Sequence, residues 1–339
     1  MKTALIGASG YTGGELLRLL SQHSEFNPEV IVAHSNAGEQ ITSLHPHLDQ
    51  YAGLKFSSLD INAVSECDLV FLAMPHGMSA QIVSQLPPNQ LVVDLGADFR
   101  LGNSSSWEKY YGGDHAGTWV YGIPELPGAR EAIKASTRVA NPGCYATAIA
   151  LSAAPILSVI NTDDLVVVAA SGTSGAGRSP KVSLLASEVS GSLTSYKFGG
   201  AHQHTPEIEE TLSKIAGKEV ILSFTPILAP MPRGILATTT ARLSAEVSKD
   251  EIRRLFSSFY EGEEFVKLLP EGQMPRTASV LGSNHVQIQC AIDLHARRVV
   301  ISTAIDNLGK GAAGQAIQNA NLIAGFPENH GLSQKGIGL

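Results

Sequence analysis

Cys144 has the surroundings expected of a nucleophile. It follows Asn141-Pro142-Gly143 and precedes an apolar run at residues 145–157. Because proline and glycine interrupt the chain before it, this run predicts a buried helix that begins close to Cys144. The N–H groups and dipole of a helix start favour a thiolate, and they can hold an oxyanion formed on an attacked carbonyl. A small buried apolar side chain is the alternative, since most cysteines outside disulfides have that role.

Two histidines separated by a single residue could carry protons. His202 and His204 follow a glycine pair and precede Pro206, which suits the first turn of a helix that continues over residues 207–215. Histidine titrates near neutrality, so we predict that His204, nearer the helix start, is the general acid/base. His202 and Glu207 are predicted to contact substrate. A His-x-His metal site is the rival, but no third ligand is evident nearby in the sequence, and we predict no metal.

Two arginines are candidate anchors for an anionic substrate. Arg100 follows the apolar run at residues 91–95, and Arg233 precedes a long predicted strand at residues 235–243. A surface arginine that pairs with Asp98 is an equally good interpretation of Arg100, because such pairs are common.

The element at the N-terminus predicts a dinucleotide-binding βαβ unit. An apolar strand at residues 3–7 leads into a glycine turn at residues 7–13 and a helical run at residues 15–20. Glycines let the backbone approach a pyrophosphate, and the helix N-terminus meets its charge. The spacing is G-x-x-G-x-x-G rather than G-x-G-x-x-G, so an ordinary glycine-rich turn is the alternative. The predicted contacts are Gly7, Ser9, Gly10, Tyr11, Thr12 and Gly13.

The end of the second strand bears on the choice of cofactor. The run at residues 30–33 ends in His34-Ser35-Asn36, and no carboxylate follows until Glu39. An NAD enzyme usually carries Asp or Glu here, which would repel a 2′-phosphate. Ser35 and Asn36 can donate hydrogen bonds to that phosphate, so we predict NADP(H), with Ser35 as a contact. His34 is equally consistent with a plain loop residue.

Further cofactor contacts are expected at strand ends and in loops. A central parallel strand is predicted at residues 69–74, and its carboxyl end is where open α/β sheets place ligands, although His76 could simply belong to a turn. The Gly/Ser loop at residues 171–178 offers backbone donors, but linkers have the same composition. Residues 101–118 are predicted to form a loop or lid. The additional predicted cofactor contacts are Pro75, His76, Ser174, Gly175 and Asn307.

Composition narrows the class of protein. The 339 residues suggest about two domains, with 43% hydrophobic and 16% charged residues. A net charge of -7 without a Lys/Arg-rich run argues against nucleic acid, and the apolar runs are shorter than the roughly 20 residues of a membrane span. The N-terminus lacks a signal-peptide pattern, and three widely spaced cysteines suggest neither disulfides nor a metal site. We expect a reduced, cytoplasmic protein that acts on a small molecule.

Four motifs resemble the N-acetyl-gamma-glutamyl-phosphate reductase family of arginine biosynthesis, a relative of aspartate-semialdehyde dehydrogenase. They lie at residues 7–13, 141–145, 202–207 and 307–311 and span nearly the whole chain. The cysteine and histidine motifs are specific to this family, whereas the glycine motif is shared more widely. The segment Tyr121-Gly122-Ile123-Pro124-Glu125 is also similar to the family.

The resemblance implies an α/β fold and a reaction. The fold would combine a Rossmann domain, residues 1–143 and 307–339, with an inserted α+β substrate and dimerisation domain, residues 144–306. NADPH would reduce N-acetyl-L-glutamyl 5-phosphate to the 5-semialdehyde through a Cys144 thioester, in a homodimer or homotetramer. A sister reductase of aspartyl phosphate or of carrier-linked aminoadipyl phosphate remains possible, as does a non-catalytic NADP-binding protein.

Overall fold

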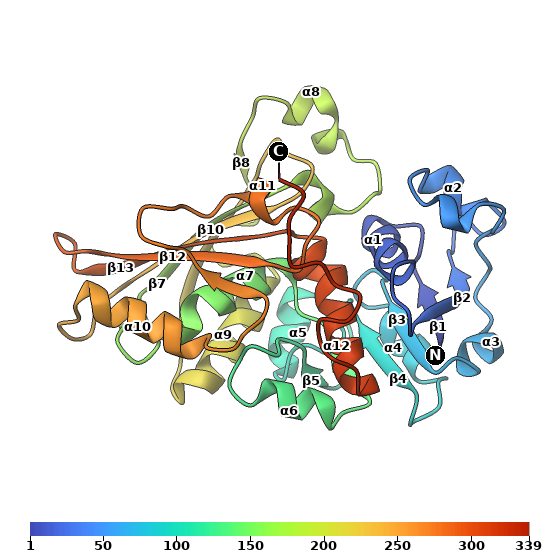
Figure 1. Cartoon of the computed structure of the whole chain (residues 1–339), viewed down its shortest axis with the longest axis horizontal. Coiled ribbons are helices and arrows are strands. Elements are labelled where there is room, and N and C mark those ends of the chain that lie inside the picture. The colour runs from blue at the N-terminus through green and yellow to red at the C-terminus, as the bar shows by residue number, and fades with distance from the viewer. Residues whose placement is uncertain (339) are drawn as a thin grey trace. The chain divides into compact units, whose positions relative to one another are not determined.

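The computed structural model describes residues 1–338 and divides into two compact units (Figure 1). Unit 1 comprises Met1–Pro124, Gly128–Pro142 and Ala312–Leu332. Unit 2 comprises Glu125–Pro127, Gly143–Gly311 and the segment from Ser333 onward.

Unit 1 is built on a parallel six-stranded sheet in the order β2-β1-β3-β4-β6-β5. Its strands are β1 Lys2–Ile6, β2 Asn27–Val32, β3 Leu69–Leu72, β4 Leu91–Asp94, β5 Val120–Tyr121 and β6 Arg138–Ala140. Its helices are α1 Tyr11–Leu20, α2 Ile41–Leu44, α3 Ile61–Ser65, α4 Ser79–Val83, α5 Ser104–Tyr110, α6 Ala129–Lys134 and α12 Gly314–Ala324, with a 3₁₀ turn, η1, at Asp49–Tyr51.

Helices cover both faces of this sheet because successive strand residues point to opposite sides. In β3, Phe71 packs in a core with residues of α1 and α12, whereas Val70 and Leu72 pack in a second core with residues of α3 and α4. All four residues of β3 are buried, as the predicted central strand requires. The layering is that of a doubly wound dinucleotide-binding fold.

Unit 2 is built on a mixed seven-stranded sheet in the order β11-β12-β13-β10-β7-β9-β8. Its strands are β7 Leu165–Ser171, β8 Thr194–Ser195, β9 Leu222–Leu228, β10 Ile235–Arg242, β11 Val266–Leu268, β12 Val286–Asp293 and β13 Arg298–Ile305. Its helices are α7 Cys144–Ala153, α8 Ala186–Val189, α9 His204–Ala216, α10 Lys249–Phe259 and α11 Thr277–Val280. Shorter turns are η2 Ala154–Ile156, η3 Thr173–Ala176, η4 Val182–Leu184 and the π-helix η5 Gly309–Ala313, which continues toward α12.

One face of the unit 2 sheet carries α7, α9 and α10 (Figure 1). Residues of β10 alternate between buried and more exposed positions, as expected for a sheet covered on one side. Val168 and Leu236, on neighbouring strands β7 and β10, are 43% and 37% exposed.

Two local predictions differ from the structure. Helix α1 begins at Tyr11, not at residue 15. Gly13 and Gly14 have low helix propensity, which led to the later predicted start, but both are helical and pack closely against neighbouring atoms. The predicted loop or lid at residues 101–118 contains α5, whose N-terminus is capped by Asn103 through the N–H groups of Ser105 and Ser106. An Asn cap before a serine run is a helix start signal that the loop interpretation overlooked. Within residues 1–338, no helix is long and apolar enough to cross a membrane.

Candidate active site

Cys144 is the first residue of α7, which confirms the predicted helix start. Gly143 is the N-cap, in extended conformation, and no side chain caps the helix. The nine residues of α7 that follow are all buried, and Cys144 alone in this helix is partly exposed. The buried helix therefore packs around its first residue, and Cys144 remains partly exposed.

The other two cysteines lie in different surroundings. Cys67 and Cys290 are buried, and burial raises the pKa of both thiols. All three cysteines are thiols. Accessibility and helix position therefore distinguish Cys144 from the other two cysteines, and its role as the nucleophile stays a prediction.

His204 lies against the residue that precedes the cysteine. A Cβ atom placed on Gly143 would lie 2.4 Å from Nε2 of His204 and 2.5 Å from its Cε1. Only a glycine therefore fits beside the imidazole at this position. His204 is the first residue of α9, so two helix starts meet at the predicted nucleophile and the predicted acid/base.

Glu207 joins the same two helices. It is buried in the first turn of α9, and its Oε1 accepts the N–H of Gly143 at 2.7 Å. This contact fixes the N-cap of α7 relative to α9. Sequence reasoning placed Glu207 against substrate, and that contact stays a prediction.

His202 is held in a buried aromatic cluster. Its Nδ1 accepts the backbone N–H of His204 at 3.1 Å, and its ring centroid lies 5.1–5.8 Å from those of Tyr145, Tyr196 and Phe224. Burial, followed by the nearby His204, lowers the pKa of His202 to about 2. His202 is therefore neutral at working pH, with its proton on Nε2 because Nδ1 accepts. Its predicted substrate contact stays a prediction.

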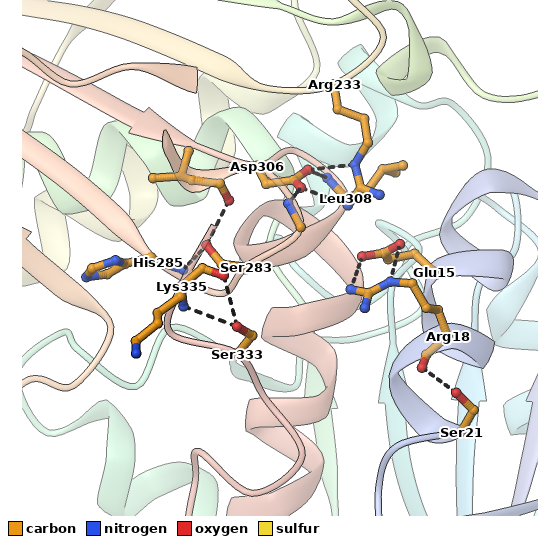
Figure 2. Close-up of polar contacts among 12 residues, drawn as sticks. Glu15, Arg18, Ser21, Arg233, Ser283, His285, Asp306, Leu308, Ser333 and Lys335 are labelled. Carbon is orange, nitrogen blue, oxygen red and sulfur yellow. Dashed lines mark hydrogen bonds and ion pairs between the residues drawn. The ribbon is translucent and has the colours of Figure 1, made fainter. Parts of the chain in front are cut away.

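Arg233 is anchored by Asp306. Its Nε lies 3.1 Å from Oδ1 of Asp306, and its Nη2 lies 2.8 Å from Oδ2 (Figure 2). Asp306 is fully buried and was not identified from the sequence. The two residues lie 73 positions apart in the chain, so no local sequence signal indicates this pair.

Three predicted cofactor contacts meet in unit 2. Asn307 donates from Nδ2 to Oγ of Ser174 at 3.0 Å and accepts the N–H of Gly234 at 2.7 Å. A Cβ atom on Gly175 would lie 3.8 Å from Nδ2 of Asn307. The Gly/Ser loop is therefore folded onto Asn307 in the η3 turn, rather than being a plain linker.

The π-helix η5 supports the back of the cysteine. A Cβ atom on Gly311 would lie 2.9 Å from Cβ of Cys144, so the chain passes directly behind the nucleophile. The neighbouring Lys310 is fully buried and forms a 2.5 Å ion pair with Glu125, which is also fully buried. This pair joins the 121–125 and 307–311 motifs, and sequence reasoning missed it. A π-helix at such a place is typical of functional sites.

The glycine turn of unit 1 is tightly packed around backbone atoms. Gly7 has φ +89°, and a Cβ atom there would lie 2.2 Å from the carbonyl oxygen of Ala73. No side chain caps α1 at Gly10, so this helix start keeps the geometry that suits an anion. His45, which the sequence did not single out, donates from Nε2 to the carbonyl of Ala8 at 2.9 Å and fills the space beside Gly14.

Ser35 and Asn36 form a small hydrogen-bonded loop after β2. Ser35 donates from Oγ to Oδ1 of Asn36 at 3.2 Å, and Asn36 donates from Nδ2 to Glu39 at 3.0 Å. Glu39 thus lies closer to the predicted phosphate contacts than its place in the sequence suggested.

The ends of β3 and β4 hold the remaining predicted residues. Pro75 and His76 follow β3, and the His76 ring lies 5.3 Å from that of Tyr111. Asp98 accepts the N–H groups of Gly77, Ser79 and Ala80.

Arg100 is not a surface residue. It is buried, and it donates to the carbonyls of Asn141 and Leu95, both at 2.8 Å. The interpretation as a surface arginine is therefore wrong. Arg100 instead fixes the segment that leads to Cys144 along the chain, and its predicted substrate contact stays a prediction.

Family models and relatives agree with this architecture. Residues 2–136 match the semialdehyde dehydrogenase NAD binding domain, and residues 144–307 match the semialdehyde dehydrogenase dimerisation domain. The N-acetyl-gamma-glutamyl-phosphate reductase of Acidothermus cellulolyticus is 58% identical, covering 99% of this chain and 98% of that protein. The enzyme of the same name from Frankia casuarinae is 53% identical, covering 98% of each.

Solved structures share the fold at low identity. Aspartate semialdehyde dehydrogenase II of Vibrio cholerae, complexed with ASA, superposes with a TM-score of 0.70 at 14% identity, covering 95% of this chain and 98% of that one. Aspartate semialdehyde dehydrogenase of Candida albicans with NADP gives 0.62 at 16% identity, covering 95% and 98%. These structures confirm the predicted Rossmann domain and the second, mixed-sheet domain. The relatives at 53% and 58% identity show the family within this fold. The chain belongs to the N-acetyl-gamma-glutamyl-phosphate reductase family of the semialdehyde dehydrogenases.

Proposed function

We propose that this chain reduces N-acetyl-L-glutamyl 5-phosphate to N-acetyl-L-glutamate 5-semialdehyde with NADPH in arginine biosynthesis, releasing phosphate. The observation that carries the proposal is the meeting of two helix starts, which sets the partly exposed Cys144 beside Gly143 and the His204 imidazole. A nucleophile next to a base is the arrangement that acyl transfer requires.

The chemistry assigned to the protein begins with a proton transfer. His204 takes the thiol proton, and the sulfur of Cys144 attacks the acyl carbon. The tetrahedral oxyanion lies against the N–H groups at the start of α7, the C–O bond to phosphate breaks, and a thioester remains on Cys144.

The dinucleotide, when bound, supplies a hydride to the thioester carbon. The resulting alkoxide re-forms its C=O bond as the C–S bond breaks, and His204 returns its proton to the departing sulfur, which gives the aldehyde and the thiol. The covalent thioester keeps the acyl group positioned for reduction, whereas an unbound acyl phosphate hydrolyses in water.

Other residues receive supporting roles. His202, Glu207, Arg233 and Arg100 are assigned to substrate binding, with an arginine facing an anionic group of the substrate. Glu207 also orients the start of α7 through Gly143. Neutral His202 fits hydrogen bonding better than proton transfer, because its pKa is lowered to about 2.

The proposed cofactor is NADP(H), bound mainly by the Rossmann part, residues 1–143 and 307–339, while residues 144–306 supply most of the substrate contacts. The uncapped start of α1 and the close-packed glycine turn support a pyrophosphate at Gly7, Ser9, Gly10, Tyr11, Thr12 and Gly13. Further contacts are assigned to Ser35, Pro75, His76, Ser174, Gly175 and Asn307.

Cofactor choice is testable by kinetics. NADPH should exceed NADH in kcat/KM by a wide margin, and Ser35→Asp should shift the preference toward NADH through repulsion of the 2′-phosphate. Equal efficiency of the two cofactors in the unmodified enzyme would mean that Ser35 and Asn36 do not meet the phosphate.

The matched dimerisation domain indicates a homo-oligomer. We assign a homodimer or homotetramer, supported by the exposed Val168 and Leu236 on neighbouring strands. Light scattering of the purified protein would give the number of subunits. The thiol state of all three cysteines supports a place in the reducing cytoplasm.

The reverse reaction tests the function. N-acetylglutamate semialdehyde, phosphate and NADP⁺ should yield NADPH absorbance, and Cys144→Ser should abolish it. Aspartate semialdehyde, turned over with higher kcat/KM, would favour the sister reaction. NADPH binding without turnover of either aldehyde would favour a non-catalytic protein.

A further inference from the structure

Asp306 is a fully buried carboxylate at the end of β13 that accepts four hydrogen bonds. Oδ1 accepts from Nε of Arg233 at 3.1 Å and from the N–H of Leu308 at 3.0 Å. Oδ2 accepts from Nη2 of Arg233 at 2.8 Å (Figure 2) and from the N–H of Gly282 at 2.6 Å. Four donors match the roughly four lone-pair sites of a carboxylate, so Asp306 is saturated in this position.

The geometry of the pair fixes the plane of the Arg233 guanidinium. Nε and Nη2 form one edge of the planar fork, and both meet the same carboxylate, which is the bidentate arrangement. The opposite edge therefore faces away from Asp306. The Arg233 side chain is 22% exposed whereas that of Asp306 is 0% exposed, so solvent reaches the arginine but not the carboxylate that holds it.

The backbone around Arg233 is fixed at further points. Asn307, next to Asp306, accepts the N–H of Gly234, next to Arg233, at 2.7 Å. A Cβ atom on Gly172 would lie 2.8 Å from the backbone nitrogen of Arg233. Both the main chain and the guanidinium of Arg233 are thus held by residues outside its own segment.

The same aspartate is tied to the back of the nucleophile. Its backbone carbonyl accepts the N–H of Gly311 at 2.9 Å, and a Cβ atom on Gly311 would lie 2.9 Å from Cβ of Cys144. The turn at residues 306–311 therefore holds the arginine with a side chain and supports the cysteine with its backbone.

We propose that Asp306 is a positioning residue that orients Arg233 to receive an oxyanion of the substrate, either the carboxylate or the phosphate. The inference rests on the proposed function, because it assumes an anionic acyl phosphate at Cys144. A guanidinium held in one plane loses less freedom when it binds a planar or tetrahedral oxyanion than one that moves freely.

The test compares Asp306→Asn with a control substitution, Asp164→Asn, in another ion pair of unit 2. Asp164 pairs with Arg298 at 2.7 Å, and Arg298 starts the strand that Asp306 follows, so Asp164→Asn removes a similar charge at the other end of β13. Each variant is measured in the reverse reaction, with separate KM values for phosphate, N-acetylglutamate semialdehyde and NADP⁺.

Asp306→Asn should raise one KM by about tenfold or more and change kcat by less than about threefold, because binding rather than chemistry is weakened. A raised KM for phosphate identifies the phosphate as the anion, and a raised KM for the semialdehyde identifies the carboxylate. The KM for NADP⁺ and the alkylation rate of Cys144 should stay unchanged, and Asp164→Asn should alter none of these values.

Arg233→Lys should raise the same KM, since lysine cannot form the bidentate pair. The double variant should have the same KM as Arg233→Lys alone, because both substitutions disrupt the same Arg233–Asp306 pair. The proposal is overturned if Asp306→Asn lowers only the melting temperature or lowers kcat alone. It is also overturned if the effects of Asp306→Asn and Arg233→Lys on KM multiply in the double variant. Should Asp306→Asn fail to fold, an unchanged KM in Arg233→Lys overturns it. An unmodified enzyme that binds NADPH but turns over no semialdehyde would instead refute the proposed function.

Discussion

At the scale of residues, the three thiols should differ in reactivity. The helix start should hold the pKa of Cys144 below the ordinary value of about 8.5, whereas burial raises the pKa of Cys67 and Cys290. The rate of alkylation by iodoacetamide against pH should therefore show an inflection below that value, absent in Cys144→Ser. Fast alkylation that peptide mapping locates at Cys67 or Cys290 would mean that the nucleophile is misassigned.

The two histidines should divide their effects between chemistry and binding. His204→Asn should lower kcat by about 10² or more and flatten its pH profile, because it removes the acid/base beside Gly143. His202→Asn should mainly raise KM and leave the pH profile unchanged, because a group with pKa of about 2 does not titrate in the working range.

Steady-state kinetics from pH 5 to 9 would compare the two variants. The reverse pattern would exchange their roles, and losses of only a few-fold in both would make the histidines structural.

Site residues could be predicted where their signals lie nearby in the sequence, and not where their contacts join distant parts of the chain. Cys144 at a helix start follows from Pro142, Gly143 and the apolar run, all within a few residues. The contact of Glu207 with Gly143 joins residues 64 apart, and that of Arg233 with Asp306 joins residues 73 apart. Such pairs depend on how whole elements pack, so a role could be predicted for Glu207 and Arg233 but their partners could not.

At the scale of elements, the end of β4 should make stability depend on pH. Asp94 is fully buried, and burial raises its pKa to about 7, with Asp98 acting in the same direction and Ser79, Gly96 and Arg100 opposing it. Ser79 and the N–H of Gly96 both donate to Oδ1 of Asp94. The folded state therefore holds a proton between about pH 4 and 7 that the unfolded state has lost, and stability falls as pH rises through this window.

Asp94→Asn mimics the protonated carboxyl and should remove that loss. Between pH 5 and 8, the free energy of unfolding of the unmodified protein should fall relative to Asp94→Asn by about 1–4 kcal/mol. Urea unfolding at several pH values measures this difference, with the exposed Asp163→Asn as control. A constant difference across the range would show that Asp94 does not titrate there.

Elements differ in how well their sequence predicts them. The wholly apolar β3 could be predicted because a short apolar run between Asp68 and Pro75 favours a strand buried on both faces. The start of α1 is not, because helix propensity disfavours Gly13 and Gly14, whereas the fold places them against Gly7 and His45. At Gly13 and Gly14 the close packing of α1 against neighbouring segments therefore outweighs the low helix propensity of glycine.

At the scale of the whole molecule, the chain divides into two compact units, and each carries one part of the proposed chemistry. Unit 1 carries the glycine turn and the predicted NADP(H) contacts near it, and unit 2 carries Cys144, both histidines and the Arg233–Asp306 pair. The resemblance of the motifs at residues 7–13, 141–145, 202–207 and 307–311 to one enzyme family predicted this fold class.

The acyl-enzyme itself tests the central claim most directly. Incubation of the enzyme with N-acetylglutamate semialdehyde and NADP⁺ in the absence of phosphate should leave one N-acetylglutamyl group on Cys144, together with one equivalent of NADPH. Mass spectrometry of the peptide that contains Cys144 would detect the thioester, and added phosphate should release it. NADPH formation with no adduct, or an adduct on Cys67 or Cys290, would contradict the account.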